Sequence, residues 1–493
     1  MKILKYYGSP LVKLVLLGLM TTPVMTNAQK PNTPNSFQND FYSFKNSINQ
    51  QFDSFIQHND SVFLQFLTQS WKEFRGTENK SPLLPKPVIQ PRVEQPVIVA
   101  PPIIIDTTKA APPIIDKLIS PEKKDSIPPQ KETLSVVPAS ISFYGTEIPI
   151  ILPNNELPVL NSLTQEGIIR FFNVAVNSSM VNNLTVSIKK NAENCKLNDW
   201  GLASMLMSVS KKFYSSRNDQ VLFTWYALIR NGFNPKVGFD QKQIYLLLPA
   251  NEKVYSTIYQ VQGKTYYLFD FEFNTQQPDL LSIYEGDYPG NKSGFSLLLT
   301  ESPQFGNHNI TKLNGPNHPI ELKINQNLID FYYAYPSCEL KVFFAAPISD
   351  DTEKQLDVYF NPLLEGKNDD ERVAFLLEFV QKGIPYLTDQ QQFGREKYFF
   401  AEETLYYPGA DCEDRAVLLA KLINRYTKLE AIGLLYPEHV SVAVNIKDIP
   451  GMKYFNYKDK HYYSCDPTYL GAQCGEIMTK LITTVPEIID FKL

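Results

Sequence analysis

The chain has 493 residues, of which 43% are apolar, and its 47 Lys and Arg residues are set against 52 Asp and Glu residues. This length allows two or three domains, and the apolar fraction excludes a wholly disordered chain. A net charge of −5 leaves no positive excess, so neither nucleic acid nor an anionic lipid surface is an expected partner.

Residues 1–28 have the pattern of a secretory signal peptide. Three lysines supply positive charge, Leu11–Met20 is an apolar stretch, and a small-residue cleavage site ends at Ala28. The stretch is too short to span a membrane, and no later run reaches about 18 uncharged apolar residues. An uncleaved membrane anchor is the alternative. We expect an exported protein, periplasmic or secreted, with no stable membrane span after signal cleavage.

Residues 34–78 are predicted to be helical, because large apolar residues recur every three or four positions. Asn59-Asp60-Ser61 interrupts the pattern and offers a cap, which predicts two helices in a hairpin. The apolar face either binds a partner, self-associates or docks onto the rest of the chain. The recurring residues are Phe37, Phe41, Phe44, Ile48, Phe52 and Phe55, followed by Phe63, Phe66, Leu67, Trp71 and Phe74.

Residues 81–139 carry 13 of the 36 prolines of the chain. Proline at this density removes backbone donors and fixes φ, so this segment is predicted to be an extended, semi-rigid linker. It separates the helical segment from a globular remainder that begins at about residue 142.

Two periodicities are mixed in the globular remainder. Alternating apolar runs predict strands at 184–188, 320–324 and 340–344, whereas helical spacing predicts helices at 202–213 and 371–382. Strands and helices in mixed order indicate an α+β fold.

The residues that point to chemistry lie near the C-terminus. Pro408-Gly409 predicts a turn, and apolar residues at helical spacing begin just after Cys412, so Cys412 is predicted in the first turn of a buried helix. A helix N-terminus favours thiolate over thiol. With a nearby imidazolium, it lowers a cysteine pKa from ~8.5 to ~3.5–7.5.

A cysteine nucleophile also needs a base and a group that orients the base. His439 starts an alternating strand 27 residues after Cys412, and Asp466 ends a second strand after another 27. If the two strands are antiparallel neighbours packed on the helix, the imidazole lies between thiol and carboxylate. The other four histidines of the chain have no such context.

This pattern resembles the transglutaminase-like superfamily of papain-type cysteine enzymes, over roughly residues 370–475. The resemblance implies a catalytic domain at 315–490, with a papain-like core in which a Cys-bearing helix packs on an antiparallel sheet that carries His and Asp. It implies acyl transfer through a thioester, with protein or peptide amides as substrates. By the same resemblance, Cys412 is the nucleophile, His439 the base and Asp466 the residue that orients the imidazole.

Several side chains beside Cys412 bear on this chemistry. Asp411, Glu413 and Asp414 raise the pKa of a neighbouring thiol unless their charges are engaged, and Arg415 is a candidate partner for one of them. A capping and solvating role explains these acids. Related calcium-dependent cysteine proteases use acids beside the Cys as ligands, so the resemblance keeps Ca²⁺ as an alternative; no other cofactor is expected. Gln392 is a candidate for holding the oxyanion.

An internal repeat is the next feature. Residues 263–270 match residues 459–466 at four of eight positions, with an offset of 196. An offset of 194, which a Leu-Ile pair upstream indicates, puts Asn218 and Tyr245 opposite the proposed nucleophile and base. Residues 142–300 are therefore predicted to form a degenerate transglutaminase-like domain. This domain is either a binding platform or only a cover for the active copy.

The five cysteines receive different expectations. Cys412 should stay free, Cys465 and Cys474 are close enough to close a small loop, and Cys195 and Cys338 pair if the two copies pack together. The function we expect is that of an exported cysteine hydrolase or acyltransferase, with hydrolysis favoured because water is abundant outside the cell. The alternative is a non-catalytic peptide-binding protein. Cleavage of cell-wall peptide cross-links differs from the first expectation only in its substrate.

Overall fold

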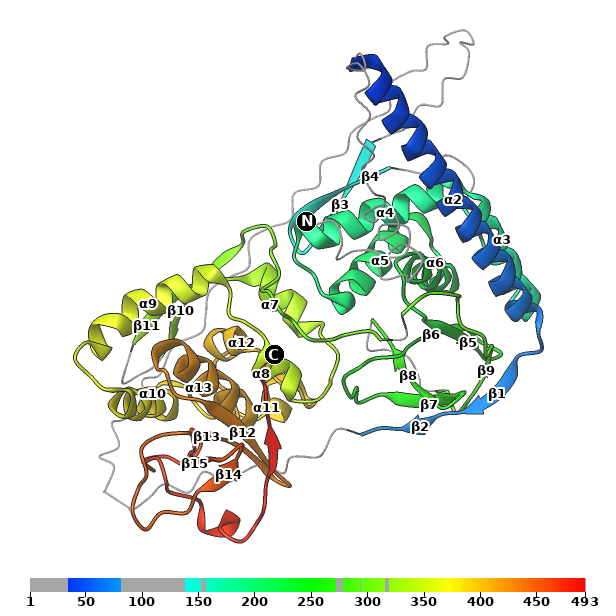
Figure 1. Ribbon diagram of the computed structural model, residues 1–493. Helices are drawn as coiled ribbons and strands as arrows, with labels where there is room; N and C mark the ends of the chain where they lie inside the picture. Colours follow the sequence, from blue (N-terminus) through cyan, green and yellow to red (C-terminus); the bar gives the residue numbers. More distant parts are fainter. Residues whose placement is uncertain are drawn as a thin grey trace, which may run out of the picture.

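The computed structural model describes residues 34–80, 138–151, 157–271, 278–292, 294–314 and 319–492. The signal peptide predicted at 1–28 and nearly all of the Pro-rich linker predicted at 81–139 lie outside these residues. Helices and antiparallel strands are mixed along the described chain, which confirms the α+β class. None of the described helices is both long and apolar enough to cross a membrane. Figure 1 shows two units, one after the other along the chain.

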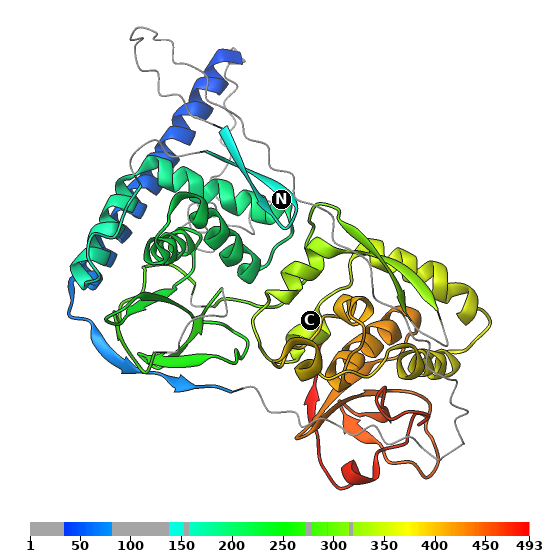
Figure 2. The same ribbon diagram turned by 180° about the vertical axis from the view of Figure 1, so that it is seen from behind.

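The first unit places a group of helices beside a sheet with the strand order β1-β9-β5-β6-β8-β7-β2 (Figures 1 and 2). Its helices are α2 (Pro34–Thr68), α3 (Gln165–Asn177), α4 (Ser179–Asn194), α5 (Asp199–Phe213) and α6 (Arg217–Arg230). The strands are β1 (Lys72–Arg75), β2 (Thr77–Glu78), β5 (Lys236–Phe239), β6 (Ile244–Leu248), β7 (Thr257–Val261), β8 (Lys264–Phe269) and β9 (Leu280–Ile283), with a separate hairpin of β3 (Pro138–Phe143) and β4 (Thr146–Ile151).

The N-terminal segment is one continuous helix, α2, so the hairpin predicted from Asn59-Asp60-Ser61 is wrong. These residues do not end a helix, because they contact the first unit. The Asp60 carboxylate accepts two hydrogen bonds from Arg230, at 2.8 and 3.0 Å, and one from the Tyr288 hydroxyl at 2.9 Å. The polar interruption in the apolar pattern therefore marks a docking contact.

The two halves of α2 differ in burial. Phe63 and Leu67 near its C-terminal end are 1% and 0% exposed, which shows that this half docks onto the first unit. Phe44 and Phe52 in the other half are 49% and 51% exposed, and the described residues do not cover them. Partner binding by this free half stays a prediction.

Residues 72–78 are strands, which corrects the helical segment predicted to end at residue 78. Only Gly76 separates β1 from β2, yet β1 pairs with β9 at one edge of the sheet and β2 pairs with β7 at the other. The sheet therefore curls until its two edges approach each other. The apolar spacing of Trp71 and Phe74 fits a helical period, but it does not exclude a strand.

The second unit is built around α13 (Cys412–Tyr426), which packs on a sheet with the strand order β14-β15-β13-β12-β16 (Figure 1). Its other helices are α7 (Gln326–Tyr333), α8 (Lys341–Ala345), α9 (Asp350–Leu364), α10 (Asp369–Gly383), α11 (Asp389–Phe393) and α12 (Ala401–Tyr406). The strands are β12 (Ala431–Tyr436), β13 (His439–Val444), β14 (Phe455–Tyr457), β15 (Lys460–Cys465) and β16 (Glu487–Ile489), with a separate hairpin of β10 (Asn309–Asn314) and β11 (Ile320–Asn325).

The two units share one arrangement of helix and sheet. In the first unit α6 is followed along the chain by β5 to β9, which lie in the spatial order β7-β8-β6-β5-β9. In the second unit α13 is followed by β12 to β16, in the spatial order β14-β15-β13-β12-β16. Each strand of one set therefore has a counterpart at the same place in the other set.

Most local predictions for the globular part are confirmed, and two are wrong. The predictions at 320–324, 202–213 and 371–382 match β11, α5 and α10. The runs at 184–188 and 340–344 are helical instead, in α4 and at the start of α8. A five-residue run whose apolar ends are four positions apart also fits one face of a helix, so its period does not decide between the two.

The cysteines follow the expectation only in part. Cys465 and Cys474 form a disulfide, as predicted. Cys195 and Cys338 are both free, so the predicted pairing is wrong. Each is buried in the apolar core, Cys195 at the end of α4 and Cys338 in a bridge with Val254.

Candidate active site

The structure places Cys412 where the sequence predicts it, as the first residue of α13. The preceding residue, Asp411, has an extended backbone, and its N–H donates to Asp414 Oδ2 at 3.4 Å. The other Asp414 oxygen accepts from the Phe399 N–H at 2.8 Å. Asp414 therefore holds the start of the helix, which is the capping role expected for an acid in the first turn.

His439 and Asp466 meet across neighbouring strands. His439 is the first residue of β13, Asp466 directly follows β15, and the two strands pair antiparallel. His439 Nε2 lies 2.7 Å from Asp466 Oδ2. Since a carboxylate only accepts, Nε2 carries the hydrogen, and in a neutral ring Nδ1 keeps a free lone pair. Nδ1 is buried and has no hydrogen-bond partner among the described residues.

The loop that carries Asp466 is held by Gln381 of α10, a residue that the sequence did not single out. Gln381 Nε2 donates to the carbonyl oxygens of Asp466, Tyr469 and Ala472, at 3.0, 2.9 and 3.1 Å. Its Oε1 accepts from the Gly471 N–H at 3.3 Å. Gln381 lies 85 positions before Asp466, and no motif marks it. Its side chain fixes the loop and thereby the carboxylate that orients His439.

The Cys412 thiol lies at the start of the strand that carries His439. Its sulfur receives a backbone hydrogen bond from Val440, the residue after His439, and donates to Glu413 Oε2 at 3.0 Å. Cys412, His439 and Asp466 are 1%, 0% and 2% exposed. All three side chains are therefore buried, and His439 forms a hydrogen bond with Asp466 but not with Cys412.

The expectation of a lowered thiol pKa is wrong for this arrangement. Burial raises the pKa of Cys412 well above its usual range, and the charges of Glu413 and Asp411 raise it further. The Val440 N–H acts in the opposite direction but is outweighed. Two carboxylates close to the sulfur thus dominate over the positive end of the helix dipole.

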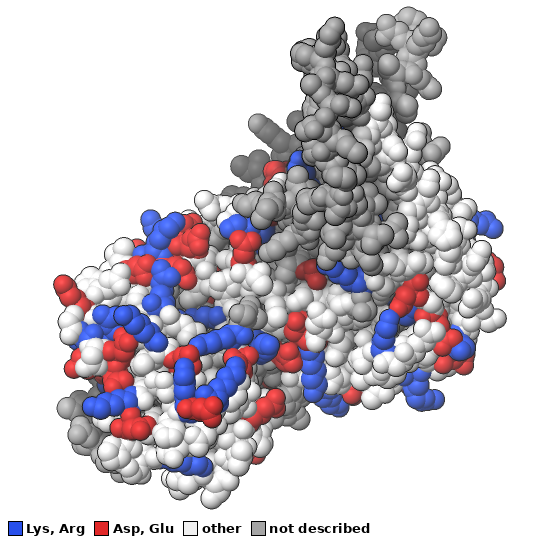
Figure 3. Space-filling model, viewed as in Figure 1, with Lys and Arg blue, Asp and Glu red and all other residues white. Residues whose placement is uncertain are grey.

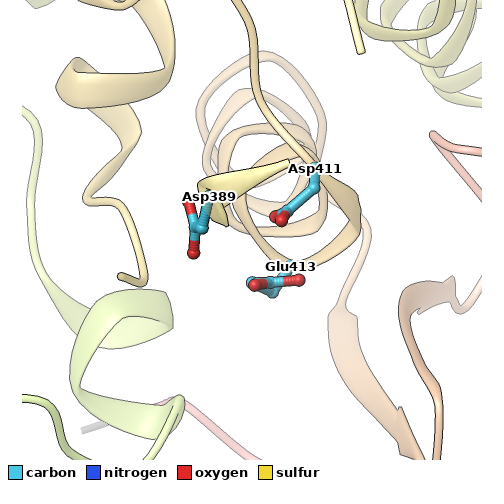
Figure 4. Close-up of side chains that lie close together, drawn as sticks. All are labelled: Asp389, Asp411 and Glu413. Carbon is cyan, nitrogen blue, oxygen red and sulfur yellow. The ribbon is translucent and has the colours of Figure 1, made fainter. Parts of the chain in front are cut away.

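Three buried carboxylates gather beside the nucleophile. Asp389 at the start of α11, Asp411 before α13 and Glu413 in the first turn of α13 face a common space in Figure 4. One oxygen of each lies within 4.8 Å of those of the others. Asp389 Oδ1, Asp411 Oδ1 and Glu413 Oε1 are all buried without a hydrogen-bond partner among the described residues. Asp389 is a member that the sequence did not indicate, because it lies 22 positions before Asp411.

Burial and mutual repulsion raise the pKa of every carboxyl in this acidic cluster. The pKa of Asp389 rises to about 8, through burial and the charge of Asp411. The pKa of Glu413 rises well above its usual range for the same reasons, and that of Asp411 is also raised by burial. Either protons or a cation must compensate these charges. Unpartnered carboxylate oxygens with no nitrogen or sulfur ligand among them fit a hard cation such as Ca²⁺.

Two predicted roles near Cys412 are not what the structure shows. Arg415 binds no carboxylate directly: it donates to the carbonyl oxygens of Ile384, Ala410 and Pro467, at 2.6, 3.2 and 3.3 Å. Gln392 Nε2 donates to the Gly409 carbonyl at 3.0 Å, so its amide is occupied in holding the turn before α13. Both side chains build the backbone around the nucleophile.

The corresponding place in the first unit has different chemistry. Asn218 lies in the first turn of α6, and its Oδ1 accepts from the Ile244 N–H at 2.9 Å. Tyr245 donates from its hydroxyl to Asp240 at 2.9 Å. Asp270 follows β8 as Asp466 follows β15. Neither a thiol nor an imidazole occupies the two aligned positions.

No protein-family model, curated protein or solved structure matches this chain. The resemblance to the transglutaminase-like superfamily therefore depends on the order and geometry of Cys412, His439 and Asp466 alone.

Proposed function

We propose that the protein is an exported cysteine hydrolase or acyltransferase that acts on protein or peptide amides through a thioester. The observation that carries the proposal is the buried contact of 2.7 Å between His439 Nε2 and Asp466 Oδ2. His439 Nδ1 has no hydrogen-bond partner among the described residues. The backbone N–H of Val440, which follows His439 in the strand, interacts with the Cys412 sulfur. The helix that starts at Cys412 and packs on the sheet of His439 supports the proposal, because this arrangement resembles the expected papain-like core.

The chemistry follows from these positions. His439 Nδ1 takes the proton of Cys412, and the sulfur attacks the substrate carbonyl carbon while the carbonyl electron pair moves to oxygen. When that pair returns, the carbon–nitrogen bond breaks and His439 protonates the leaving amine. Water then attacks the thioester, with His439 as the base, and releases the acid and the thiol. Asp466 stabilises the imidazolium that forms at each proton transfer.

Glu413 competes with His439 for the thiol proton, since its Oε2 accepts from Cys412 at 3.0 Å. We propose that Asp389, Asp411 and Glu413 hold a calcium ion. When bound there, the ion supplies the positive charge that offsets the three carboxylates. Glu413 is then engaged with its cluster partners, and its effect on the pKa of Cys412 is reduced. His439 is then the base that accepts the proton of Cys412.

Hydrolysis is favoured over transfer, because none of the described residues near Cys412 marks a site for an acceptor amine and an exported protein meets abundant water. We infer that the first unit arose by duplication and lost its nucleophile, since its helix and strands follow the same order as those of the second unit. Lys and Arg are interspersed with Asp and Glu over the second unit on the face in Figure 3. That face offers no broad area of one sign to select a charged substrate.

A non-catalytic peptide-binding protein on the same scaffold is the alternative function. The burial of Cys412 at 1% exposure favours it, because a resting enzyme usually presents its nucleophile to a cleft. In that case replacement of Cys412 leaves partner binding unchanged. The His439–Asp466 contact favours the enzyme, because binding does not require an oriented imidazole.

Labelling with a thiol-reactive peptide probe tests the proposed function. The wild-type protein should be labelled at Cys412, and Cys412→Ala should lose the label, because the other free cysteines, Cys195 and Cys338, are buried in the apolar core and burial raises the pKa of both thiols. Cys195→Ala is the matched control and should be labelled like the wild type. Labelling that persists in Cys412→Ala would show that the nucleophile has been assigned to the wrong residue.

A further inference from the structure

Thioester formation needs hydrogen-bond donors for the developing oxyanion, and beyond the backbone N–H groups at the start of α13 no donor has been assigned so far. As the sulfur attacks an amide, the carbonyl oxygen becomes negative, and enzymes stabilise that charge with donors placed in advance. The candidate Gln392 uses one of its two amide hydrogens to bind the Gly409 carbonyl, in the turn before α13. This inference rests on the proposed function, because only an acyl-transfer reaction produces the oxyanion.

Tyr386 lies next to the start of α13 without being part of it. It belongs to the segment between α10 and α11, where its backbone forms a bridge with Ala410, two residues before Cys412. The Ala410 N–H donates to the Pro385 carbonyl at 3.0 Å, which fixes this segment against the helix start. The Arg415 guanidinium lies 5.3 Å from the centre of the Tyr386 ring. The ring is therefore held from two directions.

The Tyr386 hydroxyl is buried and has no hydrogen-bond partner among the described residues. A buried donor without an acceptor is unfavourable, so each such group calls for an explanation. The lone hydroxyl is a donor that lacks an acceptor. A substrate carbonyl oxygen is an acceptor that arrives with the substrate.

The surroundings of the hydroxyl favour its protonated form. Burial raises the pKa of Tyr386 strongly, and among the neighbouring charges that of Cys412 raises it most, followed by those of Asp411 and Glu413. The hydroxyl forms no hydrogen bond with the Cys412 sulfur or with any other described residue. The phenol therefore stays protonated at the pH at which the thiolate reacts.

We propose that Tyr386 is the oxyanion donor of this site, with its hydroxyl donating to the substrate carbonyl oxygen during attack by Cys412. The proton stays on the phenol throughout. As the carbon–sulfur bond forms, the carbonyl electron pair moves to oxygen and the hydrogen bond from Tyr386 strengthens. When the tetrahedral intermediate collapses, the pair returns to the carbonyl, and His439 supplies the proton to the leaving group.

Two electrophiles that react with the same thiol distinguish an oxyanion donor from a residue that acts on the thiol or on the fold. p-Nitrophenyl acetate acylates Cys412 through an oxyanion, whereas iodoacetamide alkylates it by displacement of iodide and forms no oxyanion. Both small probes need the same opening of the buried site, so the ratio of their rates does not depend on access. Tyr386→Phe should acylate about 100-fold more slowly, in the range measured for loss of one oxyanion donor, and should alkylate within about twofold of the wild-type rate.

Tyr407→Phe is the matched control, because Tyr407 is a half-buried tyrosine five residues before Cys412 whose ring packs on Phe399. It should leave both rates unchanged. Equal slowing of acylation and alkylation in Tyr386→Phe would overturn the proposal, since it would mean that Tyr386 acts on the thiol or on the fold. Unchanged acylation would overturn it as well. Wild-type protein that alkylates but never acylates Cys412 would instead overturn the proposed function itself, and with it any oxyanion at Tyr386.

Discussion

The pKa of the Cys412 thiol is subject to influences of opposite direction. Its place at the start of α13 and the Val440 N–H favour the thiolate, whereas burial and the carboxylates of Glu413 and Asp411 favour the thiol. Charges at contact distance in a buried site outweigh a helix dipole, which amounts to about half an elementary charge. The pKa of the Cys412 thiol therefore depends on its burial first and on those carboxylates second.

The rate at which iodoacetamide alkylates Cys412 should consequently depend on both pH and calcium. In EGTA the pKa of the thiol is raised, so at neutral pH nearly all of it is protonated. Its rate should then rise about tenfold per pH unit and still be rising at about pH 9, above the usual thiol pKa of ~8.5. Saturating Ca²⁺ offsets the carboxylate charges and should move the whole profile to lower pH. Mass mapping of the alkylated peptide gives the measurement.

Glu413→Gln distinguishes the effect of the carboxylate on the thiol pKa from the effect of the cation. It prevents a negative charge from forming beside the sulfur, so in EGTA it should alkylate faster than the wild type at every pH at which Glu413 is ionised, and it should respond less to Ca²⁺. Glu365→Gln, at an exposed position after α9, is the control and should behave like the wild type. Identical wild-type profiles in EGTA and in Ca²⁺ would show that the acidic cluster holds no cation. A plateau below pH 8 in EGTA would show that the thiol pKa is not raised.

At the scale of elements, the sequence predicted the turns, helices and strands that depend on residues close together in the chain. The turn before Cys412, the helix after it and the strands that begin at His439 and end before Asp466 all follow from short-range signals, and all are found. Asp389 and Gln381 were missed, because their roles arise from loops and helices that meet only in the folded chain. The sequence thus predicted the local elements around Cys412, His439 and Asp466 better than the side chains that hold them in place.

Gln381→Leu should weaken both the fold and the orientation of His439. The substitution keeps the side-chain size but leaves the carbonyl oxygens of the Asp466 loop without their donor, at a cost of about 1–3 kcal/mol for each buried group left unpaired. We expect unfolding in urea to become easier by about 3 kcal/mol and acylation of Cys412 to slow more than alkylation by iodoacetamide. Gln390→Leu, at an exposed position in α11, should change neither. Wild-type stability and rates in Gln381→Leu would show that the Cys465–Cys474 disulfide alone holds the loop.

At the scale of the whole molecule, the order of strands in the two units is the same, and the weak repeat in the sequence pointed to it. The path of the N-terminal segment was harder to predict. The spacing of apolar residues in α2 does not show which of them meet the first unit, and the polar residues that dock it looked like a helix break. Long-range pairing also turned residues 72–78 into edge strands.

The ion pair between Asp60 and Arg230 should be the main polar attachment of α2. The side chains are 11% and 12% exposed, and removal of one partner leaves a largely buried charge, at a cost of about 3–5 kcal/mol. Asp60→Leu should lower the free energy of unfolding by roughly this amount and make α2 the first site of limited proteolysis. Lys354→Gln, which breaks an exposed pair with Asp351, should cost less than about 1 kcal/mol. Equal effects of the two substitutions would mean that apolar contacts alone hold α2.

The account as a whole depends on an acyl group that forms on Cys412 with the help of His439 and Asp466. Intact-mass analysis after brief exposure to p-nitrophenyl acetate, followed by peptide mapping at acidic pH, tests this most directly. We predict one added acetyl group, located on Cys412, absent in Cys412→Ala and formed at least about 100-fold more slowly in His439→Ala. Acetylation at another residue, or at Cys412 with equal rates in the wild type and His439→Ala, would contradict the assignment of these residues as a catalytic set.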